Sequence, residues 1–463
     1  MWEIDIFLFV LYLKNTCDKI LMNTRDPRCS GKGRNTVGRV AIVGFGSAGY
    51  HAARALSIRC PGEEIHVYST TDDGPSNPML TTYYASGRIA REALFPFGSR
   101  EQVVRELGIR LFANTPVVRL RADERALILE NGTARQYDDI VIATGARALI
   151  PPIPGLPEQG VYAMRTVDDA EKLHFALEKG LISSALVVGA SMVGIKVVEA
   201  LRNRGIPVAL ADLADRIFPL AALPEVSEEI HGRLRSRGVQ LLFGRALSSL
   251  ERTKTGITAH FADGSAYTGG AVFFCMGTRP CLELVDREEL EVGRALKVDD
   301  HMRTSRPHIY AAGDCCETRE LVTGNSMSVG LWANAAMQGE TAGANIAGND
   351  SRYQGNLIHN ITHYWDTDFI GLGDNRAEGE RMTYIHPREG WRFDAVVRDG
   401  RPVCINILDN HTLSGPAKAL LIKRLTAPEE PMGPVARLTL QRSGLPGRII
   451  AAVGGFEHDG TGA

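Results

Sequence analysis

The sequence predicts an α/β protein with two Rossmann-like dinucleotide-binding units and a smaller C-terminal α+β domain. Two glycine motifs, each following a short apolar run, predict the paired units: G-x-G-x-x-G at residues 44–49 and G-x-S-x-x-G at residues 189–194. The third observation is a change in composition after residue 348, towards His, Asp, Asn and aromatic side chains. This change places a separate domain at residues 349–463.

The first unit begins with the apolar run at residues 40–43, which is typical of a parallel strand buried on both faces. Gly44 allows a sharp turn, and Gly46 has no Cβ that would keep a pyrophosphate away from the backbone. Gly49 lets the following helix pack close to the strand. A glycine-rich turn in another kind of α/β domain is the alternative, and the second motif argues against it.

The helix after this motif carries Ser47 and Ala48 in its first turn. Its N-terminal N–H groups and its dipole favour a bound phosphate. A second strand is expected at residues 65–68, as a βαβ unit requires. Ser69 ends this strand, so the first unit lacks an acidic residue at that position.

The second unit contains Gly189, Ser191 and Gly194, and Asp212 ends its next predicted strand, 23 residues after Gly189. A carboxylate at that strand end can accept hydrogen bonds from both ribose hydroxyls and would repel a 2′-phosphate. The sequence therefore predicts NAD(H) rather than NADP(H). Arg216 lies within reach of the same pocket and argues mildly for the phosphorylated nucleotide.

The composition excludes several classes of function. The net charge of −2 over 463 residues gives no basic surface for a nucleic acid. The eight cysteines include no C-x-x-C pair, which argues against structural zinc, so no metal site is predicted. A chain of this length and ordinary hydrophobic content can form two or three domains with cores of their own.

Residues 1–38 differ from the rest of the chain, and we expect a poorly ordered N-terminal extension. Residues 4–13 are mostly apolar, but about ten residues are too few to span a bilayer. No Lys or Arg precedes them, so the basic region of a signal peptide is missing. We therefore expect a cytoplasmic protein without a membrane anchor.

Several motifs in order resemble the FAD-dependent pyridine nucleotide–disulfide oxidoreductase superfamily. The resemblance covers residues 38–348 well and the C-terminal domain weakly. After the first glycine motif, its marks are Ala-Thr-Gly-Ala at 143–146, the second glycine motif with Asp212 and Asp215-Arg216, Gly-Thr-Arg-Pro at 277–280 and Tyr-Ala-Ala-Gly-Asp-Cys at 310–315. Trp-Ala-Asn-Ala at 332–335, followed by Gln338 and Gly339, is similar to the NADH oxidase, rubredoxin reductase and nitrite reductase branch.

The resemblance implies that the first unit binds FAD and the second binds NAD(H). It divides the chain into a discontinuous FAD-binding domain (39–150 and 281–348), an NAD-binding domain (151–280) and a C-terminal interface domain (349–463). Hydride would pass from NADH to flavin N5, and a helix N-terminus would face the flavin pyrimidine and stabilise negative charge there. The implied cofactor-binding residues are Gly44, Gly46, Ser47, Ala48, Gly49, Val118, Thr144, Gly145, Gly189, Ser191, Gly194, Asp212, Gly277, Asp314, Asn334 and Ala335.

The chain departs from this superfamily at three chemically important positions. Met79 stands where the single-cysteine members carry their thiol, and a thioether cannot act as a thiolate. Thr82 stands where the ferredoxin- and rubredoxin-reductase branch often has a lysine near the flavin. Lys196 stands where the second unit commonly has a glutamate, and Glu199 follows one turn later. A positive charge near the flavin is thus transferred from one domain to the other, unless Lys196 is only a solvated helix residue.

These features predict an FAD-dependent NADH:acceptor oxidoreductase that passes electrons through the flavin without a redox disulfide, with Lys196 and Thr82 as catalytic residues. The expected acceptor is a protein of the ferredoxin or rubredoxin type, or another subunit as in phenylglyoxylate-type oxoacid oxidoreductases. One alternative is an NADH oxidase or peroxidase that uses flavin alone. Another is a non-catalytic, NAD-responsive flavoprotein. The resemblance is also compatible with a homodimer.

Overall fold

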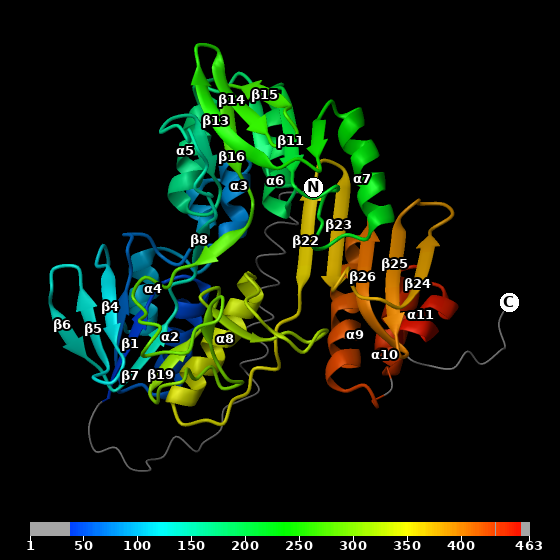
Figure 1. Cartoon of the computed structure of the whole chain (residues 1–463). Helices are drawn as coiled ribbons and strands as arrows, with labels where there is room; N and C mark the ends of the chain where they lie inside the picture. Colours follow the sequence, from blue (N-terminus) through cyan, green and yellow to red (C-terminus); the bar gives the residue numbers. More distant parts are fainter. Residues whose placement is uncertain (1–37, 431, 455–463) are drawn as a thin grey trace.

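The computed structural model describes residues 38–430 and 432–454, so the predicted extension, except Gly38, lies outside the described residues. Three five-stranded sheets organise this part of the chain (Figure 1). Two are parallel sheets flanked by helices, and the third, in the C-terminal part, is antiparallel. The predicted fold class, two Rossmann-like units with a smaller α+β domain, is confirmed.

The first parallel sheet contains strands from two distant parts of the chain. Its order is β19-β7-β1-β2-β3, so residues 309–311 pair with residues 140–142. The apolar run predicted as a buried strand forms β1, and residues 40–43 are buried. The strands are β1 (Arg39–Val43), β2 (Glu64–Tyr68), β3 (Arg110–Phe112), β7 (Asp139–Ile142) and β19 (Ile309–Ala311).

Two helices of this unit cross very closely because small residues line their contact. A Cβ added at Gly339 of α8 (Trp332–Ile346) would meet the Ala48 carbonyl oxygen of α2 (Ser47–Arg59) at 2.1 Å. The start of α8 is thereby held beside the glycine turn that precedes α2. The unit is completed by η1 (Pro78–Leu80), α3 (Thr81–Ala85), η2 (Arg91–Leu94), α4 (Arg100–Leu107), β4 (Val117–Arg121), β5 (Ala126–Leu129), β6 (Ala134–Gln136), β18 (Leu296–Lys297), β20 (Cys316–Arg319) and β21 (Ser326–Met327).

The second parallel sheet has the order β12-β11-β10-β16-β9. A two-stranded antiparallel sheet of β8 (Ala146–Ala148) and β17 (Thr278–Pro280) lies where the chain passes between the two units. The remaining elements are β9 (Val161–Ala163), α5 (Val167–Glu178), β10 (Ala185–Val188), α6 (Met192–Asn203), β11 (Val208–Asp212), α7 (Pro224–Ser236), β12 (Gln240–Phe243), β13 (Leu247–Thr253), β14 (Gly256–Phe261), β15 (Ala266–Gly269) and β16 (Ala271–Phe274).

The antiparallel sheet of the C-terminal part is covered on both faces. Helices α9 (Ser414–Thr426), α10 (Pro434–Arg442) and α11 (Gly447–Gly454) pack on one face (Figure 1). The other face packs on the second unit, where the rings of Phe369 and Phe218 lie 4.9 Å apart. The strand order is β22-β23-β26-β25-β24, with β22 (His359–Tyr364), β23 (Thr367–Gly373), β24 (Glu380–Ile385), β25 (Arg392–Arg398) and β26 (Arg401–Leu408), and η3 (His411–Leu413) precedes α9.

Among the described helices, none is both long enough and apolar enough to cross a bilayer. The predicted domain boundaries stay a prediction.

Candidate functional site

The three glycines of the first motif are required for different reasons. A Cβ at Gly44 would meet the Ala143 carbonyl oxygen at 2.1 Å, and one at Gly49 would meet the Gly44 carbonyl oxygen at 2.1 Å. Gly44 also has a φ of +109°, which L side chains rarely adopt. A Cβ at Gly46 meets nothing within 4 Å, so this glycine faces open space at the helix N-terminus. That arrangement fits a pyrophosphate lying against the backbone of Gly46.

The N-terminus of α2 lacks a side-chain cap, because Gly46 is its N-cap residue. Its first N–H groups are therefore available to a phosphate. The Trp332 carbonyl of α8 lies beside this turn and accepts a hydrogen bond of 3.2 Å from the Ser47 hydroxyl. The buried indole N–H of Trp332 has no acceptor among the described residues. The uncapped start of α2 and the open space beside Gly46 fit the pyrophosphate of FAD.

Asp314, predicted to bind the ribityl chain or pyrophosphate, follows β19 at the edge of this site. Its carboxylate accepts a hydrogen bond of 2.5 Å from Nη2 of Arg165, which comes from the second unit. Arg165 was not identified from the sequence, because it lies 149 residues from Asp314 along the chain. The guanidinium places a positive charge where the sequence predicts the FAD phosphates and ribityl hydroxyls.

The other residues predicted for FAD lie on several elements of the first unit. Gly145 has a φ of +67° and open space at its Cβ position, and the neighbouring Thr144 hydroxyl donates to the Cys281 carbonyl at 2.7 Å. Asn334 and Ala335 are buried in the first turn of α8. Val118 lies on β4 with a half-exposed side chain.

A buried asparagine that the sequence did not single out fixes the start of α8. The Asn356 side-chain oxygen accepts hydrogen bonds from the Gln338 amide at 3.0 Å and from the Asn334 amide at 3.4 Å. Asn334 therefore holds the helix in place through its side chain. Its predicted contribution to the flavin comes through the position of the helix N-terminus.

The second glycine motif repeats the close packing of the first. Cβ atoms at Gly189 and Gly194 would meet the carbonyl oxygens of Cys275 and Gly189 at 2.3 and 2.1 Å. Ser191 caps α6, because its hydroxyl accepts from the Gly194 N–H at 3.1 Å and donates to the Cys275 carbonyl at 2.8 Å. This turn fits a second dinucleotide.

Asp212 lies at the end of β11, where the sequence predicts it. Its two carboxylate oxygens accept hydrogen bonds from the backbone N–H groups of Ala190 and Ala214 at 2.7 and 2.8 Å. The negative charge is thus fixed beside the glycine turn. Arg216, the counterargument, pairs with Asp215 at 3.1 Å. Gly277 follows β16 with a φ of +97°, beside the β8–β17 connection.

The two predicted catalytic residues lie on helices that pack against each other, Thr82 on α3 and Lys196 on α6. Both side chains are buried, so the interpretation of Lys196 as a solvated helix residue is wrong. The Lys196 ammonium bonds to the Glu199 carboxylate, donates to the His363 carbonyl at 2.8 Å and lies 4.4 Å from the centroid of the Tyr83 ring.

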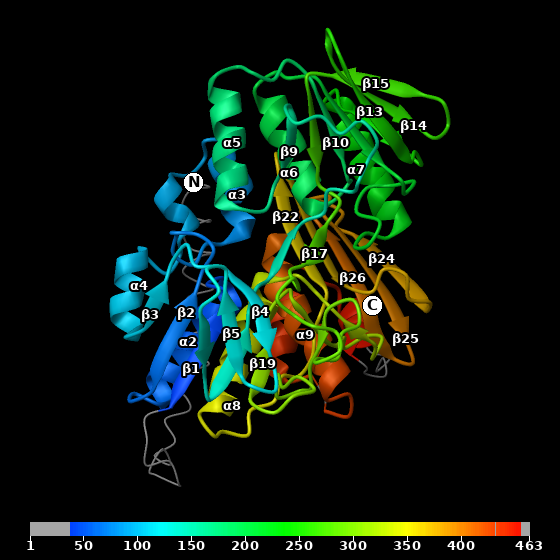
Figure 2. The same ribbon diagram turned by 60° about the vertical axis from the view of Figure 1, so that its left-hand side comes forward.

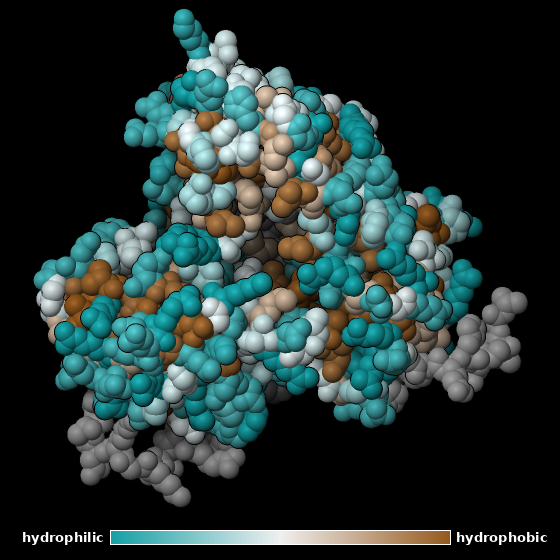
Figure 3. All heavy atoms as spheres, viewed as in Figure 1, coloured by the Kyte–Doolittle hydropathy of each residue, from teal (hydrophilic) through white to brown (hydrophobic). Residues whose placement is uncertain are grey.

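Glu199 brings further partners into this junction. Its carboxylate also accepts from the Arg88 guanidinium at 2.7 Å and from the Trp365 backbone N–H at 2.8 Å. Burial raises the pKa of Glu199, but Lys196, the Trp365 N–H and Arg88 together lower it by more, so the net shift is downward. The cluster of Lys196, Glu199 and Arg88 contains two cations and one carboxylate. Strand β22, which carries His363, lies beside α6 in both ribbon views (Figures 1 and 2). The face of the molecule seen in Figure 3 has a hollow between its upper and lower parts, and hydrophobic side chains border this hollow.

Neither the residue at the position of the relatives' cysteine nor the two buried cysteines Cys275 and Cys315 offers a reactive thiol. Met79, at the position of the relatives' cysteine, is 45% exposed on η1. Burial raises the pKa of the Cys275 thiol to about 12 and that of Cys315 to about 11. Both groups are therefore protonated near neutral pH, and neither supplies a thiolate nucleophile.

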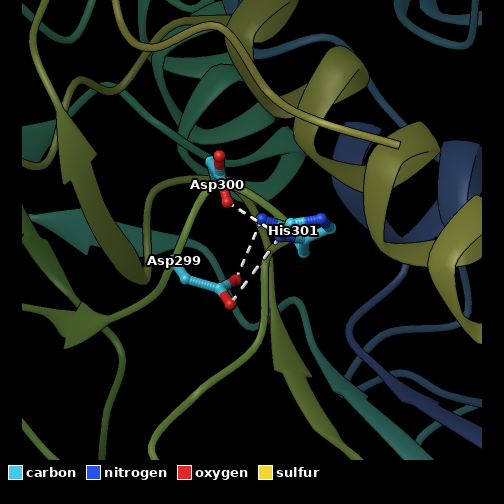
Figure 4. Close-up of side chains that lie close together, drawn as sticks. All are labelled: Asp299, Asp300 and His301. Atoms are coloured by element: carbon cyan, nitrogen blue, oxygen red, sulfur yellow. Dashed lines mark hydrogen bonds and ion pairs between the residues drawn. The ribbon is translucent and has the colours of Figure 1, made fainter. Parts of the chain in front are cut away.

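A separate cluster of Asp299, Asp300 and His301 lies on the loop before β19 (Figure 4). Nδ1 of His301 lies 2.8 Å from the Asp300 carboxylate, and Nε2 lies 2.6 Å from that of Asp350. The Asp299 carboxylate accepts from the backbone N–H groups of residues 301 and 303 at 2.9 and 2.8 Å. Since both ring nitrogens are engaged, these contacts hold the loop.

The chain thus has the architecture of a flavoprotein with two dinucleotide sites. The profile of the pyridine nucleotide-disulphide oxidoreductase family matches residues 38–339, and the chain belongs to this family. It is an FAD-dependent NAD(P)H oxidoreductase, as the sequence predicts.

Named relatives span most of the chain. An NADH oxidase from Methanocaldococcus jannaschii is 28% identical over 340 residues, covering 72% of this chain and 76% of that protein. The epsilon subunit of an NADH-dependent phenylglyoxylate dehydrogenase from Aromatoleum evansii is 26% identical over 393 residues, covering 83% and 91%. The crystal structure of a covalent putidaredoxin reductase–putidaredoxin complex has a similar fold, with a TM-score of 0.77 at 22% identity, covering 85% of this chain and 94% of that one.

Proposed function

We propose that this protein transfers electrons from NADH, through FAD, to an acceptor protein without using a protein thiol. The observation that carries the proposal is the α3–α6 junction, where Lys196 and Thr82 stand in place of a glutamate and a lysine. Met79 on η1, in place of a cysteine, supports the same proposal. FAD, when bound, accepts hydride from NADH and passes electrons on. The acceptor is of the ferredoxin or rubredoxin type, or a partner subunit.

The residues of the chain have distinct roles in this proposal. Gly46 and the N-terminus of α2 bind the FAD pyrophosphate, while Asp314 and Arg165 bind its neighbouring polar groups. Gly189, Ser191 and Asp212 bind NADH. The excess positive charge of the cluster formed by Lys196, Glu199 and Arg88 stabilises negative charge that develops on the reduced cofactor.

The phenylglyoxylate dehydrogenase subunit, which the chain matches over most of both lengths, supports a partner subunit as acceptor. The NADH oxidase from M. jannaschii supports the alternative, in which oxygen or a peroxide is the acceptor. The test is anaerobic reduction by NADH, followed by mixing with a ferredoxin, a rubredoxin or oxygen. We expect one of the two iron proteins to reoxidise the flavin faster than oxygen does. Fastest reoxidation by oxygen would favour the NADH oxidase alternative.

A further inference from the structure

Glu199 is the carboxylate on which three parts of the molecule meet. One of its oxygens accepts from Arg88 at 2.7 Å and from the Trp365 N–H at 2.8 Å, and the other accepts from Lys196. Arg88 belongs to the first unit, Lys196 to the second and Trp365 to the C-terminal part. Glu199 is only 2% exposed, so water screens these bonds very little.

The remaining contacts of Lys196 carry no negative charge. Its ammonium donates to the His363 carbonyl at 2.8 Å and lies over the Tyr83 ring, and Glu199 is the one carboxylate bonded to it among the described residues. Burial and the Arg88 charge lower the pKa of Lys196 by more than Glu199 raises it, so the net shift is downward. Without Glu199 the buried ammonium would retain a carbonyl dipole and a ring face, and the Arg88 cation would lie nearby unneutralised.

We propose that Glu199 is a positioning residue that keeps the Lys196 side chain charged and fixed between the two nucleotide-binding units. This inference rests on the proposed function, which gives the Lys196 charge its role at the flavin. Glu199 acts through its ion pairs with Lys196 and Arg88. It also links the Lys196 charge to the place where the three parts of the chain meet.

Other ionisable groups also lie around Lys196. Tyr83 faces the ammonium from α3, and Arg88 comes from the loop after α3. From the C-terminal sheet, the His363 ring lies 2.7 Å from the Asp368 carboxylate, which His411 also approaches at 3.4 Å. A change in the titration of Lys196 can therefore be tested by removing Lys196 in the presence and absence of Glu199.

The experiment measures the midpoint potential of bound FAD by dithionite titration, at about pH 6 and about pH 9. Lys196→Met is made in the wild-type and Glu199→Gln backgrounds. With Glu199 present, we expect Lys196→Met to lower the potential at both pH values. In Glu199→Gln, the same substitution should lower it clearly less at about pH 9 than at about pH 6, because loss of the carboxylate lowers the pKa of Lys196 further. An unchanged effect of Lys196→Met in both backgrounds at both pH values overturns the inference, as does no effect in the wild type.

Further variants keep the test decisive. Glu199→Asp should restore part of the lysine effect at about pH 9. Glu178→Gln, which breaks a 2.6 Å pair with Arg204 on the surface of the same unit, should leave the lysine effect as in the wild type. Loss of the lysine effect at about pH 9 in that control would overturn the inference.

If Glu199→Gln does not fold, Arg88→Gln takes its place. Glu199 then keeps Lys196 and the Trp365 N–H as partners, and the effect of Lys196→Met should persist at both pH values. Its loss at about pH 9 would overturn the inference. Because dithionite replaces NADH, failure of NADH to reduce the protein would contradict the proposed function alone.

Discussion

At the residue scale, Gly46 differs from its two motif partners in what surrounds it. Side chains at Gly44 and Gly49 would collide with backbone oxygens at 2.1 Å. Gly46 has an ordinary φ of −85° and open space beside it. A side chain at Gly46 is therefore compatible with the folded chain and incompatible with a phosphate in the same space.

We expect Gly46→Val to fold and to lack FAD, because its branched side chain fills the pyrophosphate position. Gly44→Val is the matched comparison and should fail to fold, because its Cβ meets the Ala143 carbonyl. Circular dichroism reports folding, and the visible absorbance of the purified protein reports FAD. A folded Gly46→Val protein with the wild-type FAD content would contradict the assignment.

At the element scale, the strand ends and glycine turns could be predicted because they depend on local sequence. The apolar runs at 40–43 and 185–188 lie in β1 and β10, and the glycine turns follow directly. The partners of Glu199 could not be predicted in this way. Arg88 is 111 residues and Trp365 is 166 residues from Glu199, and neither residue lies in a motif. The pairing of Arg165 with Asp314 could not be predicted for the same reason.

We expect the end of β11 to determine which nicotinamide nucleotide is preferred. Asp212 is held by two backbone N–H groups, so its charge cannot move far from the glycine turn. A 2′-phosphate beside it costs on the order of 1–3 kcal/mol, or about 5–150-fold in affinity. We expect kcat/KM for NADH to exceed that for NADPH by a factor in this range, with the difference reduced in Asp212→Asn. Equal values for the two nucleotides in the wild type would show that this strand end does not select the cofactor.

At the scale of the whole molecule, the α3–α6 junction is one place where all three parts of the chain meet. The C-terminal sheet reaches it through the His363 carbonyl and the Trp365 N–H. Replacing Glu199 by Gln leaves two cations without their carboxylate. Breaking a buried pair of this kind costs about 3–5 kcal/mol.

We expect Glu199→Gln to lower the free energy of unfolding at pH 7 by about 3–5 kcal/mol. The pKa of Glu199 is lower in the folded protein than its ordinary value of 4.5. Its contribution is therefore complete above about pH 4.5 and is lost as the pH falls through the lowered folded value. Urea unfolding of both proteins at pH 7 and at lower pH measures this difference. A difference that grows as the pH falls would have the wrong sign.

The central claim is that electrons from NADH pass through FAD without a protein thiol. Anaerobic titration of the FAD-loaded protein with NADH measures how many electron pairs the protein stores. We predict full reduction of the flavin spectrum at about one NADH per FAD, because the proposed route uses no two-electron centre besides the flavin. Uptake of about two NADH per FAD, with a thiol or disulfide reduced alongside the flavin, would contradict this account.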